Sequence, residues 1–476
     1  MLVGVIHFAL FLWTHSSVED ISAPIRNVGT MVELRNSEDI LRLREIAEYI
    51  LPDRIAIGHV PVVIKSNRIS ELEHAQLRYE ILERDLDEVF KAEQLRLASS
   101  KHQAQGPATW FSDFKSYDEI RSYSDMLVQL RPDLLSIESI GLSLESRDIF
   151  ALRIGIGEPG IRPAMLITSL MHAREWVSGM VSMCTADALV RRYDSDPEIQ
   201  SVVDNVDIYI IPVLNPDGYT FSWDPDGERL WRKNRRDGFG VDLNRNWSTG
   251  WGSAGSSDDP MDQTYRGVAP FSEPETIALR DFVSKIPNLR SYIDYHSYSQ
   301  FIVYPPGFEA SRSQAINEAD HEQMAHVLAD RIHSVHMFPY EVIRGVDWYP
   351  AGGTSMDWGA YEKGWMSLTI ELRPNPTFEM GFVLPPDQIL PTCEENLPGM
   401  IQIANWTIDG IIPEIDIDDS DNTEEEAGSN DKDNASSSGC SITSSHPTPW
   451  LMQCAWIILA VTQVRPRSRP TRKPAV

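Results

Sequence analysis

The sequence predicts an α/β protein of more than one domain. Segments with strand-like and helix-like patterns alternate along its 476 residues, which are 42% hydrophobic. A chain of this length can bury a large core and usually divides into domains. Polar groups typical of active sites directly follow several strand-like segments. Open α/β sheets bind ligands beyond the ends of their strands, so we expect the functional site there.

The first residues predict a targeting segment. Residues 1–13 form an apolar stretch too short to cross a bilayer, and small polar residues follow to Ser17. The pattern is typical of a signal peptide, here residues 1–17, although a basic start is missing beyond the terminal amine. We therefore expect a secreted, extracellular protein.

A small α/β domain is predicted between residues 20 and 105. Strands are expected at 30–34 and 59–65, helices at 37–50 and 69–82, and a charged helix at 85–97. From Arg96 to Lys101 the chain turns polar and carries basic residues that a protease can cleave. The next domain is expected to begin just before Trp110.

A second, larger α/β domain is predicted from residue 108 to residue 410. Its expected helices are 117–130 and 176–193, and its expected strands are 149–154, 164–170, 206–213, 289–295 and 366–370. The run from Asn215 to Gly218 contains a proline and predicts a turn after the third of these strands.

A metal site is indicated at the ends of two of these strands. His172 and Glu175 directly follow the strand 164–170, and His296 follows the strand 289–295. Two neutral imidazoles and one carboxylate leave Zn²⁺ a fourth position for water, the arrangement of a catalytic rather than a structural site. A single histidine and glutamate with two residues between them can occur by chance in a chain of this length. The prediction of one Zn²⁺ per chain therefore depends on the distant third ligand, His296.

Charge and composition restrict the partners and describe the C-terminal region. The net charge of −28 argues against a nucleic-acid partner. Residues 411–449 are acidic and serine-rich, which predicts a disordered linker. The apolar run 450–464 precedes a basic end and is shorter than the roughly 20 residues of a typical membrane span. It is a candidate membrane tether, and the alternative is an irregular tail without function.

Cysteine and histidine usage suggests little further chemistry. Cys184 and Cys393 fall in predicted helices, whereas Cys440 and Cys454 lie in the tail, so free or buried thiols are the favoured interpretation. Four histidines are interpreted as exposed groups of a helix surface rather than as a second metal site. These are His321, His326, His333 and His336.

Six motifs in order give the larger domain a strong resemblance. They are His172 with Glu175 and the runs 229–233, 240–247, 295–300, 349–358 and 369–373. Residues 110–409 resemble the catalytic domain of the zinc metallocarboxypeptidases of the pancreatic carboxypeptidase A type, and residues 20–105 resemble their inhibitory prosegment. The resemblance implies a mixed twisted sheet flanked by helices, and a zymogen that hydrolyses the C-terminal peptide bond of peptides and proteins.

The resemblance also implies a role for each site residue. Glu371 is the expected proton acceptor, and Arg232 is expected to stabilise the oxyanion of the transition state. Asp242 is expected to orient His172. The terminal carboxylate of the substrate would be bound by Asn244, Arg245 and Tyr349. Contacts further from the scissile bond are expected from Arg174 and Tyr298. The neighbouring cations Lys233, Arg235 and Arg236 are interpreted as a solvated face.

The side-chain preference depends on the pocket for the C-terminal residue. Met356 lies at the position that decides specificity in the family, and its apolar thioether favours hydrophobic or aromatic C-terminal residues. Arg344 lines the same pocket in the family, and a guanidinium turned inward would admit acidic residues instead. Two further alternatives are a catalytically inactive peptide-binding relative, which Glu371 and the complete ligand set argue against, and an enzyme acting on acylated amino acids.

Overall fold

The computed structural model describes residues 24–50, 58–100, 107–309, 311, 316–375 and 381–413. The predicted signal peptide, Lys101, nearly all of the acidic linker and the apolar run 450–464 lie outside these residues. None of the helices within the described ranges combines the length and apolar character that a membrane span requires.

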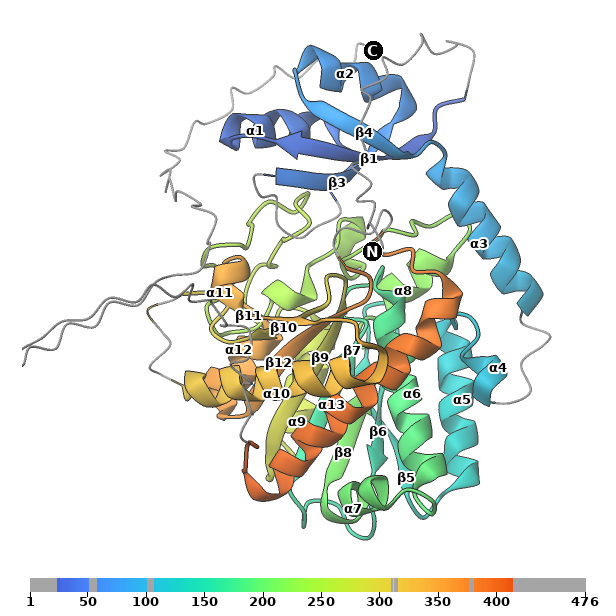
Figure 1. The fold of residues 1–476 in the computed structure, drawn as a ribbon, viewed down its shortest axis with the longest axis vertical. Coiled ribbons are helices and arrows are strands. Elements are labelled where there is room, and N and C mark those ends of the chain that lie inside the picture. The colour runs from blue at the N-terminus through green and yellow to red at the C-terminus, as the bar shows by residue number, and fades with distance from the viewer. Residues whose placement is uncertain are drawn as a thin grey trace, which may run out of the picture. The chain divides into compact units, whose positions relative to one another are not determined.

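The N-terminal domain is built on a four-stranded antiparallel sheet with the strand order β2-β3-β1-β4. Figure 1 labels β1, β3 and β4 of this sheet. Its strands are β1 (Asn27–Leu34), β2 (Tyr49–Ile50), β3 (Gly58–Lys65) and β4 (Arg78–Glu83). Its helices are α1 (Ser37–Ile46) and α2 (Ile69–His74), and α3 (Leu86–Ser100) follows the sheet. Val32, Leu43 and Leu72 are among the side chains that form its core.

Two of the predicted helices in this domain were wrong in extent. The segment predicted as one helix at 69–82 is α2 followed by strand β4, with a turn at Gln76, whose φ is 58°. Tyr79 and Ile81 pack on the domain core with the two-residue period of a strand, and β4 pairs with β1. Likewise, the helix predicted to reach Ile50 ends at Ile46, and strand β2 follows it. Pairing between strands distant in sequence outweighs local helix propensity in both places.

The larger domain has an eight-stranded mixed sheet, as predicted from the resemblance. The strand order is β11-β10-β12-β9-β7-β8-β6-β5, with parallel pairing from β12 through β9 and β7 to β8. The strands are β5 (Leu135–Leu142), β6 (Asp148–Ile154), β7 (Ala164–Ser169), β8 (Asp207–Ile211), β9 (Leu289–Ser297), β10 (Phe301–Tyr304), β11 (Glu341–Arg344) and β12 (Met366–Leu372).

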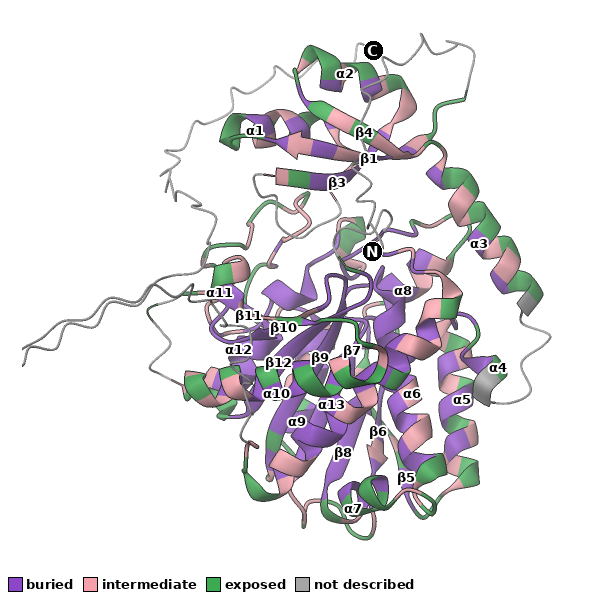
Figure 2. Cartoon of the chain, viewed as in Figure 1, coloured by how far each residue is buried: buried purple, intermediate pink, exposed green. Residues whose placement is uncertain are grey.

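Helices cover both faces of this sheet. Along β7, Met165 and Ile167 join one hydrophobic cluster, whereas Leu166 joins another, because successive side chains of a strand point to opposite faces. As a result the central strands are buried along their length (Figure 2). The helices of the domain are α4 (Pro107–Trp110), α5 (Tyr117–Leu130), α6 (Trp176–Arg192), α7 (Pro197–Asn205), α8 (Pro216–Trp223), α9 (Pro274–Val283), α10 (Glu318–His336), α11 (Gly345–Trp348), α12 (Ser355–Trp358) and α13 (Ile389–Asp409).

Local sequence explains where several of these helices begin and end. Ser116 and Glu119 form a reciprocal capping box at the start of α5. Gly410, with a φ of 74°, ends α13. The predicted turn at Asn215 was wrong, because helix α8 starts there. The Asn215 side chain accepts a hydrogen bond from the Gly218 amide at 2.9 Å, and Pro216 occupies the first helical turn.

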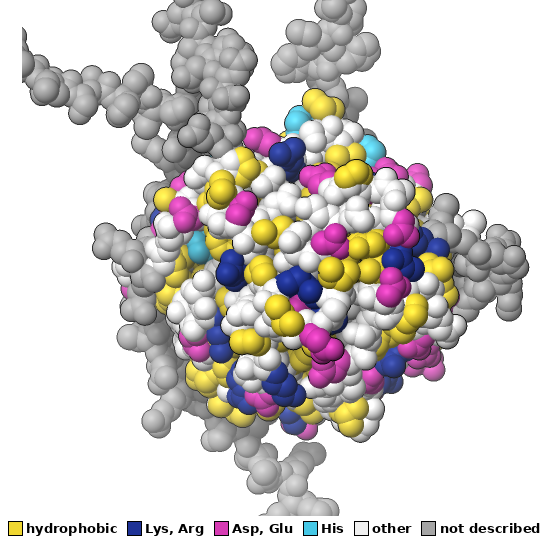
Figure 3. All heavy atoms as spheres, turned by 90° about the horizontal axis from the view of Figure 1, so that it is seen from below, with side chains coloured by type: hydrophobic (Ala, Val, Ile, Leu, Met, Phe, Trp, Pro, Cys, Tyr) yellow, Lys and Arg dark blue, Asp and Glu magenta, His cyan; other side chains and the backbone are white. Residues whose placement is uncertain are grey.

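The described surface carries charges of both signs. Figure 3 shows lysine and arginine side chains interspersed with acidic and apolar ones on one face.

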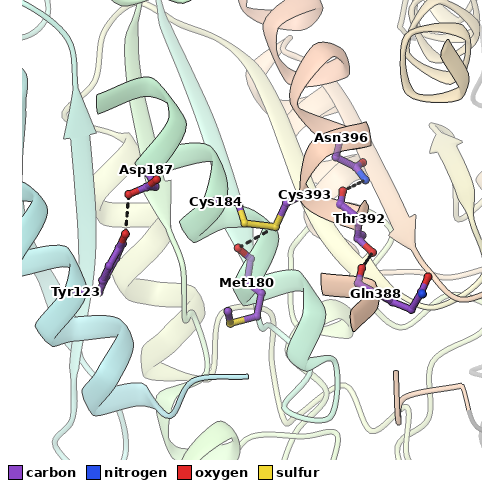
Figure 4. Close-up of a disulfide and its surroundings, with 8 residues drawn as sticks. All are labelled: Tyr123, Met180, Cys184, Asp187, Gln388, Thr392, Cys393 and Asn396. Atoms are coloured by element: carbon purple, nitrogen blue, oxygen red, sulfur yellow. Dashed lines mark hydrogen bonds between the residues drawn. A yellow bond between two sulfur atoms is a disulfide. The ribbon is translucent and has the colours of Figure 1, made fainter. Parts of the chain in front are cut away.

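A disulfide between Cys184 and Cys393 corrects the expectation of free thiols. It links α6 to α13 across 209 residues of sequence, and the two Cα atoms lie 5.9 Å apart (Figure 4). The two cysteines are far apart in sequence and become neighbours only because both helices pack on the same face of the sheet. The spacing of cysteines therefore could not reveal the pair.

The double variant C184S/C393S should unfold more readily than the wild type. A disulfide that closes a long loop restricts the unfolded chain and typically contributes about 2–4 kcal/mol. We expect the melting temperature to fall by several degrees in thermal denaturation monitored by circular dichroism. A reductant should lower the melting temperature of the wild type but not of the variant. Equal shifts in both proteins would contradict a stabilising role for this bond.

Candidate metal centre and active site

Two imidazoles and a carboxylate converge at the ends of β7 and β9. The Nδ1 of His172 lies 2.7 Å from one oxygen of Glu175, and the Nδ1 of His296 lies 3.0 Å from the other. The ligand atoms of all three residues lie within 4.8 Å of one another, and all three side chains are buried. The predicted ligand set is therefore assembled in one place.

The surroundings of these ligands fit a zinc ion. The outer nitrogens of the imidazoles face carboxylates, with Nε2 of His172 lying 3.2 Å from Asp242 and Nε2 of His296 lying 2.9 Å from Asp294. These contacts leave both Nδ1 atoms turned toward Glu175. Carboxylate partners of this kind fix the tautomer and ring orientation of histidines that bind metal. Nitrogen and carboxylate donors in this number match a catalytic zinc site.

Charge compensation explains how an acid can be ionised in this buried place. Burial alone would raise the pKa of Glu175, but the adjacent His172 and His296 lower it below its ordinary value. Burial would lower the pKa of His296, whereas the carboxylates of Asp294 and Glu175 raise it well above its ordinary value. The cluster thus favours bound positive charge, which a divalent cation supplies.

Arg232 lies beside this cluster. Its Nη2 donates to Oδ2 of Asp242 at 2.9 Å, and its Nη1 lies 3.9 Å from Glu175. The guanidinium is fully buried. The structure thus brings Arg232 and Asp242 next to the ligands, as the sequence predicted.

The guanidinium of Arg245 is held by two backbone carbonyls, which bind two of its three nitrogens. Its Nε donates to the carbonyl of Gly255 at 2.8 Å and its Nη1 to the carbonyl of Asn244 at 2.8 Å. Gly255 has a φ of 77°, and a Cβ there would meet the Pro350 carbonyl at 1.6 Å, so only glycine fits. The buried Nη2 of Arg245 has no hydrogen-bond partner among the described residues. An unpaired buried donor is costly, and an anion would satisfy it.

Two further predicted site residues come from other parts of the fold, Glu371 from β12 and Tyr349 from the end of α11. In the parallel pairing of β12 with β9, Glu371 lies directly opposite His296. Glu371 is buried, whereas Tyr349 is half-buried, with its ring 5.9 Å from the guanidinium carbon of Arg245. The predicted catalytic and carboxylate-binding residues therefore lie around one centre.

The methyl group of Met356 lies close to the backbone of two glycines, Gly307 and Gly345. A Cβ placed on Gly345 would lie 3.4 Å from the Met356 methyl and 2.9 Å from the Cα of Gly307. Arg344 is occupied elsewhere, donating to Asp347 at 2.8 Å and to Glu318 at 3.1 Å. The inward-turned guanidinium considered above is thus not the arrangement observed.

Arg174 and Tyr298 share a cluster with the N-terminal domain. The Arg174 guanidinium lies 4.2 Å from the centre of the Phe382 ring, and the Tyr298 ring meets Phe382 edge-on at 5.0 Å. Side chains of the N-terminal domain pack in the same cluster, namely Val63, Leu86, Tyr49 and Phe90. Arg229 also contacts this domain, donating to Glu93 at 2.7 Å with both side chains buried.

The interpretation of Lys233 as part of a solvated face was wrong. Lys233 is buried rather than solvated, since its Nζ donates to the carbonyls of Pro260 and Asp262, and burial lowers its pKa to about 8. Arg235 stacks on the Phe221 ring at 3.6 Å. His321 is buried as well.

The His321 ring nitrogens contact two carbonyls, those of Asn317 and Trp365. Among the described residues, the cluster at His172 is the one group of acids, histidines and cysteines that could hold a metal. His321 is therefore not the exposed helix-surface group that was predicted.

Asp294 was missed by the sequence analysis. It precedes His296 by two residues in β9, so both side chains point to the same face of the sheet. An acid two positions before a metal-binding histidine in a strand is the pattern that could have revealed it.

The fold and the centre define a metalloenzyme that holds one divalent ion at the strand ends of a mixed sheet. The chain belongs to the zinc carboxypeptidase family, which residues 120–399 match. It is therefore a zinc metallocarboxypeptidase, and the predicted zinc ligands His172, Glu175 and His296 are confirmed.

Curated relatives support this assignment over much of the chain. The sequence is 34% identical to carboxypeptidase A1 of Rattus norvegicus, over 71% of this chain and 80% of the relative. It is 35% identical to carboxypeptidase A2 of Mus musculus, over 71% and 81%. These similarities extend the match beyond the catalytic motifs.

Solved structures agree. The crystal structure of thrombin activatable fibrinolysis inhibitor is similar with a TM-score of 0.73 and 27% identity, covering 81% of this chain and 100% of that chain. Carboxypeptidase A from Helicoverpa armigera gives a TM-score of 0.69 and 25% identity, over 81% and 98%.

Asn234, two residues after Arg232, is buried and links this part of the chain to two acids. The side-chain amide of Asn234 donates to Glu273 at 2.7 Å and to Glu275 at 3.1 Å. One oxygen of Glu275 is buried without a partner among the described residues, and burial raises the pKa of this acid to about 7.

Replacing Glu275 by glutamine should change how stability depends on pH. Between its ordinary pKa of 4.5 and the raised value near 7, the unfolded chain is ionised while the folded protein keeps its proton. The free energy of unfolding of the wild type therefore falls as pH rises through this window. The variant lacks this loss, so its stability relative to the wild type should rise by roughly 1–3 kcal/mol from pH 5 to pH 8.

Urea denaturation at both pH values, with saturating zinc, measures the difference. Glu138→Gln, at an exposed position on β5, is the matched control and should show no such change. An equal difference between Glu275→Gln and the wild type at both pH values would refute the argument.

Proposed function

We propose that this zinc carboxypeptidase is an extracellular zymogen that removes hydrophobic or aromatic residues from the C-termini of peptides. The observation that carries the preference is the pairing of Arg344 with two acids, which leaves the uncharged thioether of Met356 as the side chain at the deciding position. The disulfide supports an extracellular location, because such bonds persist in oxidising compartments. The membrane tether at 450–464 stays a prediction.

The proposed chemistry assigns one task to each polar group. Bound zinc supplies an activated water and polarises the scissile carbonyl. Glu371 takes a proton and returns it to the leaving amine, as a buried carboxylate beside the ligands can do. Arg232 stabilises the developing oxyanion, a contribution of about 3–4 kcal/mol for comparable donors. Asp242 orients both His172 and Arg232 through its two oxygens.

The free carboxylate of the substrate is assigned to Arg245. Its buried Nη2 is a donor without an acceptor in the part of the chain that the structure describes, and a carboxylate would supply one. Asn244 adds an amide next to Arg245, and Tyr349 brings a phenol close to the same guanidinium. Recognition of a terminal charge at a fixed place limits hydrolysis to the last peptide bond.

The pocket for the C-terminal side chain is assigned to Met356 and its glycine neighbours. The thioether offers no charge, and a Cβ added to Gly345 or Gly307 would lie 3.4 or 3.6 Å from its methyl group, so the two glycines bring backbone close to it. Asp357, the next residue, is buried and has hydrogen-bond partners of its own. Its carboxylate accepts from the Gly307 amide at 2.9 Å and the Thr354 hydroxyl at 3.0 Å, and burial raises its pKa to about 7.

The N-terminal domain, within residues 20–105, is assigned the role of an inhibitory prosegment. Its side chains Val63, Leu86 and Phe90 pack in the same cluster as Tyr298 and Phe382. A substrate that needs Tyr298 and Arg174 would compete with these contacts. Proteolysis near Arg96 to Lys101 would relieve them, although Arg96 lies in α3 and is paired with Asp113.

Replacing Glu371 by glutamine should abolish most hydrolysis while leaving the fold intact. General acid and base catalysis typically contributes about 10²–10⁴-fold, so kcat should fall by that factor. Glu341→Gln, an exposed carboxylate on β11, is the control and should keep wild-type turnover. Zinc content and melting temperature should match in all three proteins. Full turnover by Glu371→Gln would exclude this residue as the base.

Peptides that differ only in a C-terminal Phe, Leu, Arg or Glu should separate the possible preferences. After limited trypsin treatment, kcat/KM for Phe and Leu should exceed that for Arg and Glu by about 10-fold or more. Arg344→Ala should keep this ranking, because the guanidinium pairs with Glu318 and Asp347. Preferential release of Glu that is lost in Arg344→Ala would establish an acidic preference instead.

The untreated chain in the same assay tests the prosegment. It should release every residue more slowly than the trypsin-treated protein, and a zinc chelator should stop both. Equal rates before and after cleavage would show that the N-terminal domain does not inhibit.

A further inference from the structure

Asp294 makes a direct contact with a zinc ligand from inside the sheet. Its Oδ2 lies 2.9 Å from Nε2 of His296, the nitrogen that faces away from the metal position. The carboxylate is fully buried. Because the two residues are separated by one position in β9, the strand itself holds the acid beside the imidazole.

The remaining partners of Asp294 are hydroxyl groups. Thr168 on β7 donates to Oδ1 at 2.7 Å, and Ser355 at the start of α12 donates to Oδ2 at 2.5 Å. Asp242 differs in this respect, since its charge is also compensated by Arg232. Among the described residues, His296 is the ion-pair partner of Asp294. The negative charge of Asp294 is therefore directed toward the metal ligand.

Ser355 extends this contact to the carboxylate-binding residues. Its backbone amide donates to Oδ1 of Asn244 at 3.0 Å, while its hydroxyl contacts Asp294. Asn244 in turn has its side-chain nitrogen 3.4 Å from Nε2 of His296. These four residues form a closed ring of contacts. The next residue after Ser355 is Met356.

We propose that Asp294 is a positioning residue that retains zinc by orienting His296 and that fixes Asn244 through Ser355. The role rests on the zinc site and not on the identity of the C-terminal residue removed. Carboxylate partners of zinc-bound histidines typically change metal affinity by about 10–100-fold. Loss of Asp294 should therefore be visible in zinc retention without any substrate present.

The first test is the rate of zinc release from Asp294→Asn to an excess of a colorimetric chelator. The amide has nearly the same volume but no charge, so release should be about 10-fold faster or more than from the wild type. Ser182→Ala removes a buried hydroxyl bonded to Ser169, away from the ligands, and should release zinc at the wild-type rate. Wild-type release by a folded Asp294→Asn would overturn the proposal.

A second variant keeps the test decisive if Asp294→Asn does not fold. The double variant T168V/S355A keeps the carboxylate but removes both hydroxyls that orient it. Its zinc release should be faster than that of the wild type. Zinc release from the double variant at the wild-type rate would reject the orienting role. Release that is faster than that of the wild type but equal to that of Ser182→Ala would reject it as well.

The link to Asn244 is tested by kinetics of Ser355→Ala. With its hydroxyl lost, the segment that positions Asn244 is less constrained, so KM for a peptide ending in Phe should rise several-fold while kcat changes little. A fall in kcat at unchanged KM would contradict the link. The Phe peptide also distinguishes this result from a wrong specificity assignment, because wild-type hydrolysis of that peptide is measured in the same series.

Discussion

The parallel alignment of β7, β9 and β12 is the constraint on which the metal centre depends. Parallel neighbours end at the same edge of a sheet, so residues that follow them meet without any long loop to guide them. The register that places Glu371 opposite His296 also places the chain after β7 beside both. A slip of one residue in β12 would turn Glu371 to the other face. The surrounding helices serve this alignment by burying both faces of the strands.

Around the ligands, buried charges occur with compensating partners. Arg232 offsets Asp242, the two imidazoles offset Glu175, and Asp294 accepts from hydroxyls as well as from His296. Isolated charges would be very costly in this dry place, whereas paired ones become rigid dipoles. The Nη2 of Arg245 is the exception, because it has no partner within the described ranges, and in the proposed function the substrate supplies that partner.

The sequence predicted the parts of the structure that depend on local patterns and on short motifs. The ligands His172, Glu175 and His296 could be found because each follows an apolar strand, and the mixed sheet followed from the family resemblance. Strand β4 and the disulfide could not be predicted from the sequence, since each depends on a partner far away in the chain. The burial of Lys233 could not be predicted either, because the ammonium group donates to a backbone carbonyl, and every residue type has a backbone carbonyl. Asp294 was visible in the strand period but lacked a motif.

The Cys184–Cys393 bond has a mechanical consequence for whatever follows the catalytic domain. Helix α13 is the last described element, and the chain continues beyond it for more than 60 residues. Tension applied to that continuation would travel along α13 and pass through sulfur into α6, the helix that begins directly after Glu175. Because Cys393 lies near the start of α13, this covalent link would stop the peeling of the chain at residue 393 and would keep the load from the residues that precede it, β12 among them.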